Sequence, residues 1–278
     1  MGTKKRSPLV AVMMPAYNSE KYIDDAIKSI LNQSYKNILL IIDNDASTDK
    51  TGEIAKEWTK KDPRVRYMEN EQNLGGAGTR NRMLERYPDE AEYFMWMDSD
   101  DTVEPDIIEK KVNFLETHPE IDAVGHAIDY VDDQMNTISH RHYPLTDKEI
   151  RKTYPIHSPV PHGGLMLRKH LSSYRYREDF RTTQDYELWG RMLSDGKHFA
   201  NLPDVLYHYR HHAGQVKQRS MKQSLKLSLK VKSRYIFKPN FFSFRALGRY
   251  VGEAVLLAFP NRFILWLFFN SLKKQKGQ

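Results

Sequence analysis

Three carboxylates directly follow an apolar run in the segment Tyr93–Asp101, which has the sequence Tyr-Phe-Met-Trp-Met-Asp-Ser-Asp-Asp. An uninterrupted apolar run is typical of a strand that is buried on both faces, as in a parallel sheet. Side chains alternate along an extended chain, so Asp98 and Asp100 would point to the same side. Two converging carboxylates are a common way to bind a hard divalent cation such as Mg²⁺ or Mn²⁺. A solvated acidic turn is the alternative interpretation of this stretch taken alone.

Polar clusters also follow other predicted strands. Each cluster comes directly after a short apolar run or leads into the next helix, and they are Pro15–Ser19 after Pro8–Met14, Asp43–Asp49 after Ile38–Ile42, and Asn73–Asn81 after Val65–Met68. In the last cluster, glycines precede a predicted helix and would let backbone N–H groups approach an anion, and Arg80 adds a fixed positive charge. Because open α/β sheets bind ligands at the carboxyl ends of their strands, all of these clusters should converge on one crevice.

The elements that must position these clusters alternate between strand and helix over about the first 120 residues. This alternation predicts an α/β fold with a mostly parallel central sheet, helices on both faces and a nucleotide-binding half at 1–120. The half at 121–215 is less regular. It contains a predicted strand at Ile121–Val131, loops and a hairpin in the polar segment 132–160, and a loop that enters a strand at His162–Arg168. A helix is predicted to begin at Thr183. An aromatic strand is predicted at Leu206–His212.

Composition excludes some classes of protein. The chain of 278 residues is 40% hydrophobic and 12% aromatic, which suits a globular protein with a substantial core. It has no cysteine, so a disulfide framework and a thiolate metal site are both ruled out. The apolar run Pro8–Ala16 is short and is followed by a polar helical pattern, so we interpret it as a first strand and not as a signal peptide.

Charge divides the chain into an acidic body and a basic tail. From Lys217 onward there are 14 Lys and Arg residues and one acidic residue, Glu253. The tail therefore carries +13 and the first 216 residues carry −6, within a total of +7. This asymmetry predicts an anionic partner for the tail, a membrane lipid before nucleic acid.

The tail at 216–278 interleaves aliphatic and aromatic residues with Lys and Arg. Its uncharged runs, 254–261 and 263–272, are shorter than the roughly 20 residues that span a bilayer. We expect residues 217–276 to lie on an anionic membrane as a basic amphipathic region. The alternative is that they pack on the body as ordinary helices. The alternation of Leu and Lys over Leu225–Lys232 fits a strand or a helix.

Six motifs in this order resemble those of the family 2 glycosyltransferases of GT-A fold, over roughly residues 8–215. They are Met14-Pro15-Ala16-Tyr17-Asn18, Asp45-Ala46-Ser47-Thr48-Asp49, Asn73 with Arg80-Asn81, Asp98-Ser99-Asp100-Asp101, Gln184-Asp185, and Tyr209-Arg210 with His212. Each motif is loose by itself, but the ordered set is specific. The resemblance implies an inverting, metal-dependent transfer of a sugar from a nucleotide-diphosphate sugar.

The resemblance also implies roles on the donor side. Residues that follow the first strand, here Pro15, Ala16, Tyr17 and Asn18, would line the nucleotide. Asp45 would accept a hydrogen bond from the base, which favours uracil and a UDP-sugar. Arg80 would lie near the nucleotide and its phosphates. Asp98 and Ser99 would contact the nucleotide.

Metal and acceptor roles are implied in the same way. Asp100, Asp98 and His212 would bind Mn²⁺ or Mg²⁺, and Asp185 would be the general base. Asp101, Gly163, Gly164, Gln184 and Arg210 are candidates for diphosphate or acceptor contacts. The family commonly has Glu where this chain has Gln184, so an acceptor contact that needs a negative charge there is in doubt.

Inverting transfer needs a base for the acceptor hydroxyl and charge stabilisation on the leaving diphosphate, which these residue types supply. We therefore expect a glycosyltransferase at the inner face of the cell membrane, acting on a lipid-linked glycan in polysaccharide biosynthesis. A nucleotidyltransferase also uses paired carboxylates and a metal, and an inactive transferase anchored by its tail is a third reading. A nucleic-acid binder is least expected, because the body is acidic.

Overall fold

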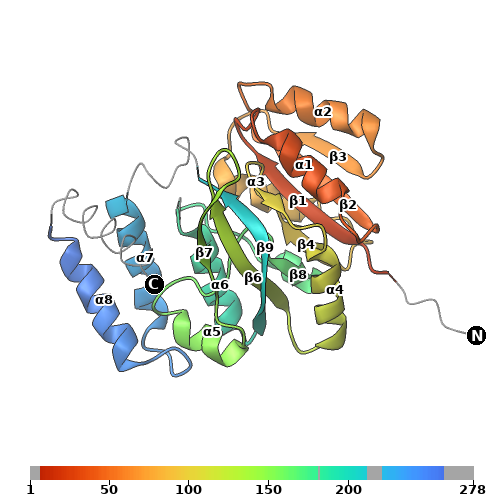
Figure 1. The fold of residues 1–278 in the computed structure, drawn as a ribbon. Coiled ribbons are helices and arrows are strands. Elements are labelled where there is room, and N and C mark those ends of the chain that lie inside the picture. The colour runs from red at the N-terminus through yellow and green to blue at the C-terminus, as the bar shows by residue number, and fades with distance from the viewer. Residues whose placement is uncertain (1–6, 181, 212–220, 260–278) are drawn as a thin grey trace, which may run out of the picture.

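Nine strands form one sheet in the computed structural model, which describes residues 7–180, 182–211 and 221–259. The strand order is β3-β2-β1-β4-β8-β6-β9-β5, and β7 pairs with β6 off this path. Helices lie on both sides of the sheet, and α7 and α8 lie together at the end of the molecule far from β3 (Figure 1). The predicted α/β architecture is therefore present.

The first half has the alternating order that the sequence predicts. Its elements are β1 (Val10–Ala16), α1 (Ile23–Leu31), β2 (Ile38–Asn44), α2 (Thr51–Lys61), β3 (Val65–Glu69), α3 (Gly75–Glu85), β4 (Tyr93–Trp96), β5 (Thr102–Val103) and α4 (Ile107–Thr117). Strand β1 pairs in parallel with both β2 and β4, and β2 pairs in parallel with β3. The loops after these strands therefore meet at one edge of the sheet.

The second half mixes strand directions. It consists of β6 (Ala123–Val131), β7 (Thr137–Arg141), α5 (Asp147–Thr153), β8 (Met166–Arg168), a 3₁₀ helix (Lys169–Ser173), α6 (Gln184–Ser194) and β9 (Phe199–Arg210). Strand β8 runs antiparallel between β4 and β6, whereas β9 is parallel to β6. The hairpin expected in 132–160 is formed by β6 and β7. Helix α5 was not predicted, although Thr146 and Glu149 form a capping box at its start.

The described part of the tail is helical, which decides between the two expectations for Leu225–Lys232. Helix α7 (Met221–Tyr235) packs on α6, and α8 (Phe244–Leu256) packs on α7. Val231 and Tyr235 of α7 are buried in the core that α6 shares. None of the helices in the described ranges has the length and apolar character that a membrane span requires.

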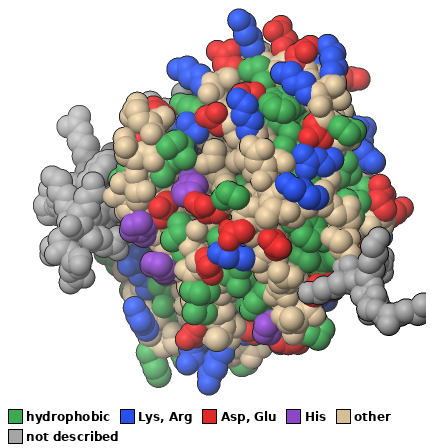
Figure 2. Space-filling view, turned by 45° about the vertical axis from the view of Figure 1, so that its right-hand side comes forward, with side chains coloured by type: hydrophobic (Ala, Val, Ile, Leu, Met, Phe, Trp, Pro, Cys, Tyr) green, Lys and Arg blue, Asp and Glu red, His purple; other side chains and the backbone are tan. Residues whose placement is uncertain are grey.

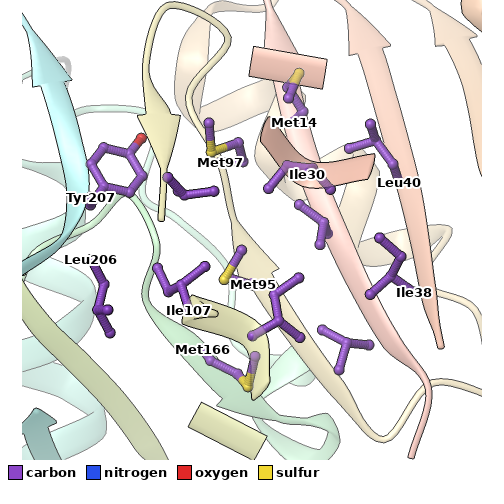
Figure 3. Packing of buried hydrophobic residues seen from close by; sticks show 14 of the residues in the cluster. Met14, Ile30, Ile38, Leu40, Met95, Met97, Ile107, Met166, Leu206 and Tyr207 are labelled. Atoms are coloured by element: carbon purple, nitrogen blue, oxygen red, sulfur yellow. The ribbon is translucent and has the colours of Figure 1, made fainter. Parts of the chain in front are cut away.

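Two apolar cores, one on each face of the sheet, explain why the first strands are continuous apolar runs. In β1, Val10, Val12 and Met14 face the core that contains α1 and α4. The alternate residues Ala11 and Met13 face the core built with α3 and α6. Met14, Ile30, Leu40, Met95 and Ile107 belong to the first core and lie between the sheet and its helices (Figure 3). Burial on both faces requires apolar side chains at every position of these strands.

Asp43 is an exception within β2, because its carboxylate is fully buried. Burial raises the pKa of Asp43 to about 6, and the guanidinium of Arg82, 3.3 Å away, acts in the opposite direction. One carboxylate oxygen has no hydrogen-bond partner in the part of the chain that the structure describes. Ionised Asp43 is therefore a cost to the folded state.

We expect Asp43→Asn to change how stability depends on pH. The folded pKa of about 6 lies above the ordinary value of 3.8, so protonation of Asp43 stabilises the folded state. This contribution is fully present below pH 3.8 and is lost as the pH rises through about 6. Between about pH 4.5 and 7.5, the wild-type free energy of unfolding should fall by about 2 kcal/mol more than that of Asp43→Asn. Urea unfolding at these two pH values measures both. The exposed Asp89→Asn should keep the wild-type difference, and an unchanged difference in Asp43→Asn would contradict the assignment.

Candidate active site

The loops after β1 and β2 are tied together by hydrogen bonds. The Asn18 N–H donates to the Ser47 hydroxyl at 3.0 Å, and the Thr48 N–H donates to the Asn18 side-chain oxygen at 2.9 Å. Asn18 has a positive φ of 48°, a conformation that asparagine tolerates better than most residues. Next to it, the Tyr17 side chain is 50% exposed, so it is not a core aromatic. An open aromatic ring at this edge is suited to stacking on a planar ligand.

Asp45 fixes the start of α3. Its carboxylate accepts hydrogen bonds from the backbone N–H groups of Leu74 at 2.8 Å and Gly75 at 2.9 Å, and from the Asn70 side chain at 2.8 Å. Gly75 has a φ of +71°, which glycine adopts without strain. In this structure Asp45 therefore orders the glycine cluster, and its role toward a nucleotide base stays a prediction.

Arg80 of α3 reaches the carboxylate of Asp98 just after β4, at 2.9 Å. Its guanidinium also lies 5.8 Å from the ring centre of Trp96 and 5.9 Å from that of Tyr176. A Cβ on Gly76 would lie 2.8 Å from this guanidinium, so a side chain there would displace Arg80. The buried Arg80 Nε has no hydrogen-bond partner within the described residues. Arg80 thus places a fixed positive charge beside Asp98–Asp101, which we call the acidic loop. The Arg80 Nε–H remains available to a hydrogen-bond acceptor.

Asp101 anchors the acidic loop to the second half of the chain. Asp101 is only 1% exposed, and its carboxylate accepts hydrogen bonds from the Tyr207 hydroxyl at 2.8 Å and from the Arg210 N–H at 2.7 Å. Burial, together with the charges of Asp100 and Asp98, raises the pKa of Asp101 well above its usual range. The Asp98 N–H donates to the same Tyr207 hydroxyl at 3.3 Å. Both Asp101 oxygens are engaged inside the protein, which does not favour the ligand contact predicted for it.

Arg210 holds the loop from the other side. Its Nε donates to the backbone carbonyl of Asp100 at 3.0 Å, and its guanidinium lies 3.5 Å from Asp25 and 4.7 Å from the ring centre of Tyr22. The side chain is buried, so Arg210 pairs with an acidic neighbour as well as with the loop. Ser99 is also buried. His212, the predicted metal ligand, lies outside the described residues.

The turn at Gly163 and Gly164 packs under the acidic loop. The Gly164 N–H donates to the Trp96 carbonyl at 2.7 Å, and a side chain on Gly163 would collide with the Tyr207 hydroxyl. The Gly164 carbonyl accepts a hydrogen bond from Lys111, whose Nζ lies 2.8 Å from the His126 ring nitrogen. Because Lys111 is completely buried, its pKa is lowered well below the usual range. These glycines shape the floor of the site and leave their predicted ligand contacts as predictions.

Helix α6 brings Asp185 to the same place from the opposite side. The N-cap is Thr183, so Asp185 lies in the first turn and does not cap the helix itself. Asp185 and Asp98 both raise the pKa of the buried Tyr176, in addition to the larger effect of burial, and Arg80 lowers it. The Gln184 amide nitrogen lies 3.1 Å from where a side chain on Gly76 would begin. The charges of Asp185, Arg80 and Asp98 therefore all act on Tyr176, and Gln184 lies next to Gly76 of α3.

Sequence reasoning missed several residues that build the site. Tyr176 carried no signal, because its position opposite Trp96 depends on how the chain folds back. Lys111 could have been found, since it interrupts the apolar side of α4 between Ile107 and Leu115. A lysine at a core position of a helix needs a buried partner, which here is His126.

The comparisons with known proteins agree with this geometry. Residues 11–175 match the family model described as Glycosyl transferase family 2. A putative teichuronic acid biosynthesis glycosyltransferase, TuaG of Bacillus subtilis, is 30% identical over 205 residues, covering 73% of this chain and 79% of the relative.

Two solved structures have the same fold. One is Staphylococcus aureus TarS 1–349 in complex with UDP-GlcNAc, with a TM-score of 0.63 and 19% identity, over 80% of this chain and 66% of that one. The other is the mannosyltransferase PcManGT of Pyrobaculum calidifontis in complex with GDP-Man and Mn²⁺, with a TM-score of 0.62 and 16% identity, over 96% and 80%. They confirm the predicted GT-A fold.

Tyr207→Phe should loosen the acidic loop, because it removes a hydroxyl that bonds both Asp101 and the backbone of Asp98. Leaving a buried carboxyl short of a donor costs about 1–3 kcal/mol of unfolding free energy. We expect a lower melting temperature and a weaker response to UDP and Mn²⁺ in thermal-shift titrations. Tyr35→Phe is the control. It removes a partly buried hydrogen bond to the Pro8 carbonyl, far from the site, and should keep the ligand response. Equal ligand responses in both variants would contradict the assigned role of Tyr207.

Proposed function

The chain belongs to glycosyltransferase family 2, and from this membership we propose that it is an inverting, metal-dependent enzyme that moves a sugar from a UDP-sugar to an acceptor hydroxyl. The observation that supports this proposal best is that α6 brings Gln184, next to Asp185, against Gly76 of α3, the helix whose Arg80 pairs with Asp98 at 2.9 Å. In the proposal, Arg80 and Asp98 belong to the donor side of the site and Asp185 is its base.

On the donor side, the chain offers an open aromatic ring at Tyr17, the ordered start of α3 and the guanidinium of Arg80. The ring would stack on the base, and Arg80 would interact with the nucleotide diphosphate. The UDP-GlcNAc complex of TarS supports a uridine donor, and the GDP-Man complex of PcManGT supports a nucleotide-sugar in general. We favour UDP because Asp45 occupies the position that contacts the base in this family.

The acidic loop fits a divalent metal in the chemistry of its donors. Asp98 and Asp100 supply two carboxylates to one loop, although Asp98 is also paired with Arg80 at 2.9 Å, and Mg²⁺ and Mn²⁺ prefer oxygen ligands shared between carboxylates and phosphates. His212 is a further candidate that lies outside the described residues. A metal held there would stabilise the negative charge that develops on the departing diphosphate. The Mn²⁺ in PcManGT supports this assignment.

Asp185 would remove the proton from the acceptor hydroxyl as that hydroxyl attacks the anomeric carbon. It lies in the first turn of α6, two residues after the N-cap Thr183. In the proposed reaction, the acceptor hydroxyl would attack from the Asp185 side as the diphosphate leaves toward Asp98 and Arg80. Such an in-line displacement would invert the anomeric carbon in one step without an enzyme nucleophile.

The acceptor we propose is a lipid-linked glycan at the inner face of the cell membrane, in the synthesis of a surface polysaccharide. The relative TuaG is described as a teichuronic acid biosynthesis glycosyltransferase, which supports a polysaccharide product. Residues 217–276 carry the positive charge that an anionic membrane would attract. The body shows acidic and basic side chains interspersed over the face in Figure 2, so the tail is the better candidate for this contact.

Thermal stabilisation by nucleotides tests the donor proposal. Ligand binding to the native state raises the melting temperature by mass action. UDP with Mn²⁺ should stabilise the wild type, UDP alone should have little effect, and Asp100→Ala should abolish the metal-dependent part. Stabilisation by UTP but not by UDP would favour a nucleotidyltransferase instead, and no response to any nucleotide would favour an inactive binder.

Asp185→Asn tests the base. Loss of a general base should lower the rate of transfer by about 10²–10⁴-fold, while stabilisation by UDP and Mn²⁺ stays at the wild-type level. Asp195→Asn, just past the other end of α6, is the matched control and should keep the rate. Transfer rates are measured by UDP release in the presence of acceptor, and the anomeric configuration of the product is determined by NMR. A retained anomeric configuration, or an active Asp185→Asn, would contradict the mechanism.

A further inference from the structure

Helix α8 exposes large apolar side chains while it buries its only acidic residue. Glu253 is 7% exposed, whereas Phe244 is 85% exposed. Val251 and Val255 are also exposed, at 51% and 55%, as are the two arginines of the helix, Arg245 and Arg249. A helix on the surface of a globular body normally buries its apolar side. The outer face of α8 therefore combines apolar and positively charged side chains.

The large apolar side chains that α8 exposes form one stripe. At 3.6 residues per turn, Phe244, Gly248, Val251 and Val255 fall on a single face of α8. The buried residues Ala246 and Glu253 fall on the opposite face. No charged residue of α8 lies within the stripe. Just before the helix, Phe242 is also exposed and its ring packs edge-on against Phe244, 5.6 Å between centres.

Ion pairs explain how α8 stays attached by its polar side. Glu253 accepts hydrogen bonds from Lys232 of α7 at 2.6 Å and from Arg249 at 2.7 Å. Lys232 and Glu253 are both buried, so removing either one would leave an uncompensated charge. The pair fixes α8 on α7 and leaves the apolar stripe facing outward.

Helix α7 in turn is fixed to the catalytic body beside Asp185. The Ser224 hydroxyl lies 3.2 Å from that of Thr182, three residues before Asp185. Arg234 lies 3.5 Å from Glu187 of α6, and the Tyr235 ring packs edge-on against Tyr154. The outer face of α8 therefore has a defined position relative to the helix that carries the candidate base. In Figure 1, α8 is the outermost element at this end of the molecule.

The tail that carries the stripe is basic, and Arg245 and Arg249 of α8 itself are exposed. Apart from the buried Glu253, the charged residues of the described tail are all positive: Lys222, Lys226, Lys230, Lys232, Arg234, Lys238, Arg245 and Arg249. An apolar stripe beside a field of positive charge matches a surface that offers both hydrocarbon and negative charge. The same charge disfavours a second copy of the chain as the partner, because two copies of the α7–α8 pair would bring like charges together.

We propose that the outer face of α8, with Phe242, docks on an anionic bilayer and lies in its interface. This inference rests on the membrane location proposed above and names the element responsible. The phenylalanine and valine side chains enter the boundary between headgroups and acyl chains, and the exposed Arg245 contacts lipid phosphates. Because α7 fixes α8 to α6, docking also sets the height of Asp185 above the membrane. A lipid-linked acceptor would then meet the base at a constant distance.

Vesicle flotation with the full chain tests the proposal. The wild type should bind vesicles that contain phosphatidylglycerol and bind pure phosphatidylcholine weakly. The double variant Phe244→Ser/Val255→Ser should lower the partition coefficient at least about tenfold, since two exposed apolar side chains lose their burial in lipid. Ile138→Ser/Leu145→Ser, which alters two exposed apolar residues on the body, is the matched control and should bind as the wild type. All variants should keep the wild-type melting temperature, because the altered side chains are exposed.

Two further measurements separate the possible failures. Arg245→Gln should weaken binding at low salt and match the wild type at high salt, where surface charges are screened. Metal-dependent UDP stabilisation should be unchanged in every α8 variant, so loss of membrane binding and loss of the proposed function are distinguishable. Equal vesicle binding by wild type and Phe244→Ser/Val255→Ser would overturn the proposal. A wild-type dimer in light scattering that the double variant abolishes would assign the stripe to a second copy instead.

Discussion

The buried carboxyl of Asp101 is the constraint on which the rest of the site depends. It lies at the end of the acidic loop from the first half of the chain and is bonded to Tyr207 and Arg210 of β9, more than 100 residues later. A buried carboxyl is costly unless its oxygens are satisfied, so the loop and the strand must come together in one arrangement. Asp98 and Asp100, the other two carboxylates of the loop, are less buried, and the anchored Asp101 holds the loop that carries them.

The two sides of the site are built by different means. The donor side comes from loops after parallel strands, and their hydrogen bonds to one another, such as those between Asn18 and Ser47 or Asp45 and Gly75, order them before any ligand arrives. The proposed acceptor side comes from the start of α6, where Gln184 lies next to Gly76 of α3. Arg80 links the two, since its guanidinium contacts two aromatic rings and the Asp98 carboxylate. Preorganised charges of this kind need no rearrangement when negative charge develops on a leaving group.

Helices α7 and α8 form the C-terminal helical pair, in which α7 packs on α6 and α8 packs on α7. Helix α7 is part of the core that α6 shares, so the boundary near residue 216 marks a change in charge more than a break in packing. The Lys232–Glu253 pair turns the polar side of α8 inward. A buried ion pair contributes little net stability compared with apolar packing, but it specifies orientation. Here the orientation is what exposes the phenylalanine and valine stripe.

The sequence by itself determined the parallel first half, because strands buried on both faces need unbroken apolar runs such as Ile38–Ile42 and leave polar residues at their ends. It also identified Asp98, Asp100, Arg80 and Asp185 as candidates, through residue types and order. Only the tertiary structure decided which of these side chains are open and which are enclosed. Asp100 and Asp101 are neighbours of one type, yet only Asp101 is sealed by a tyrosine and a backbone N–H from β9. Likewise, helical spacing in α8 defines two faces, and the ion pair with Lys232 decides which of them is turned outward. Local pattern fixes periodicity, whereas burial depends on partners that are distant in the chain.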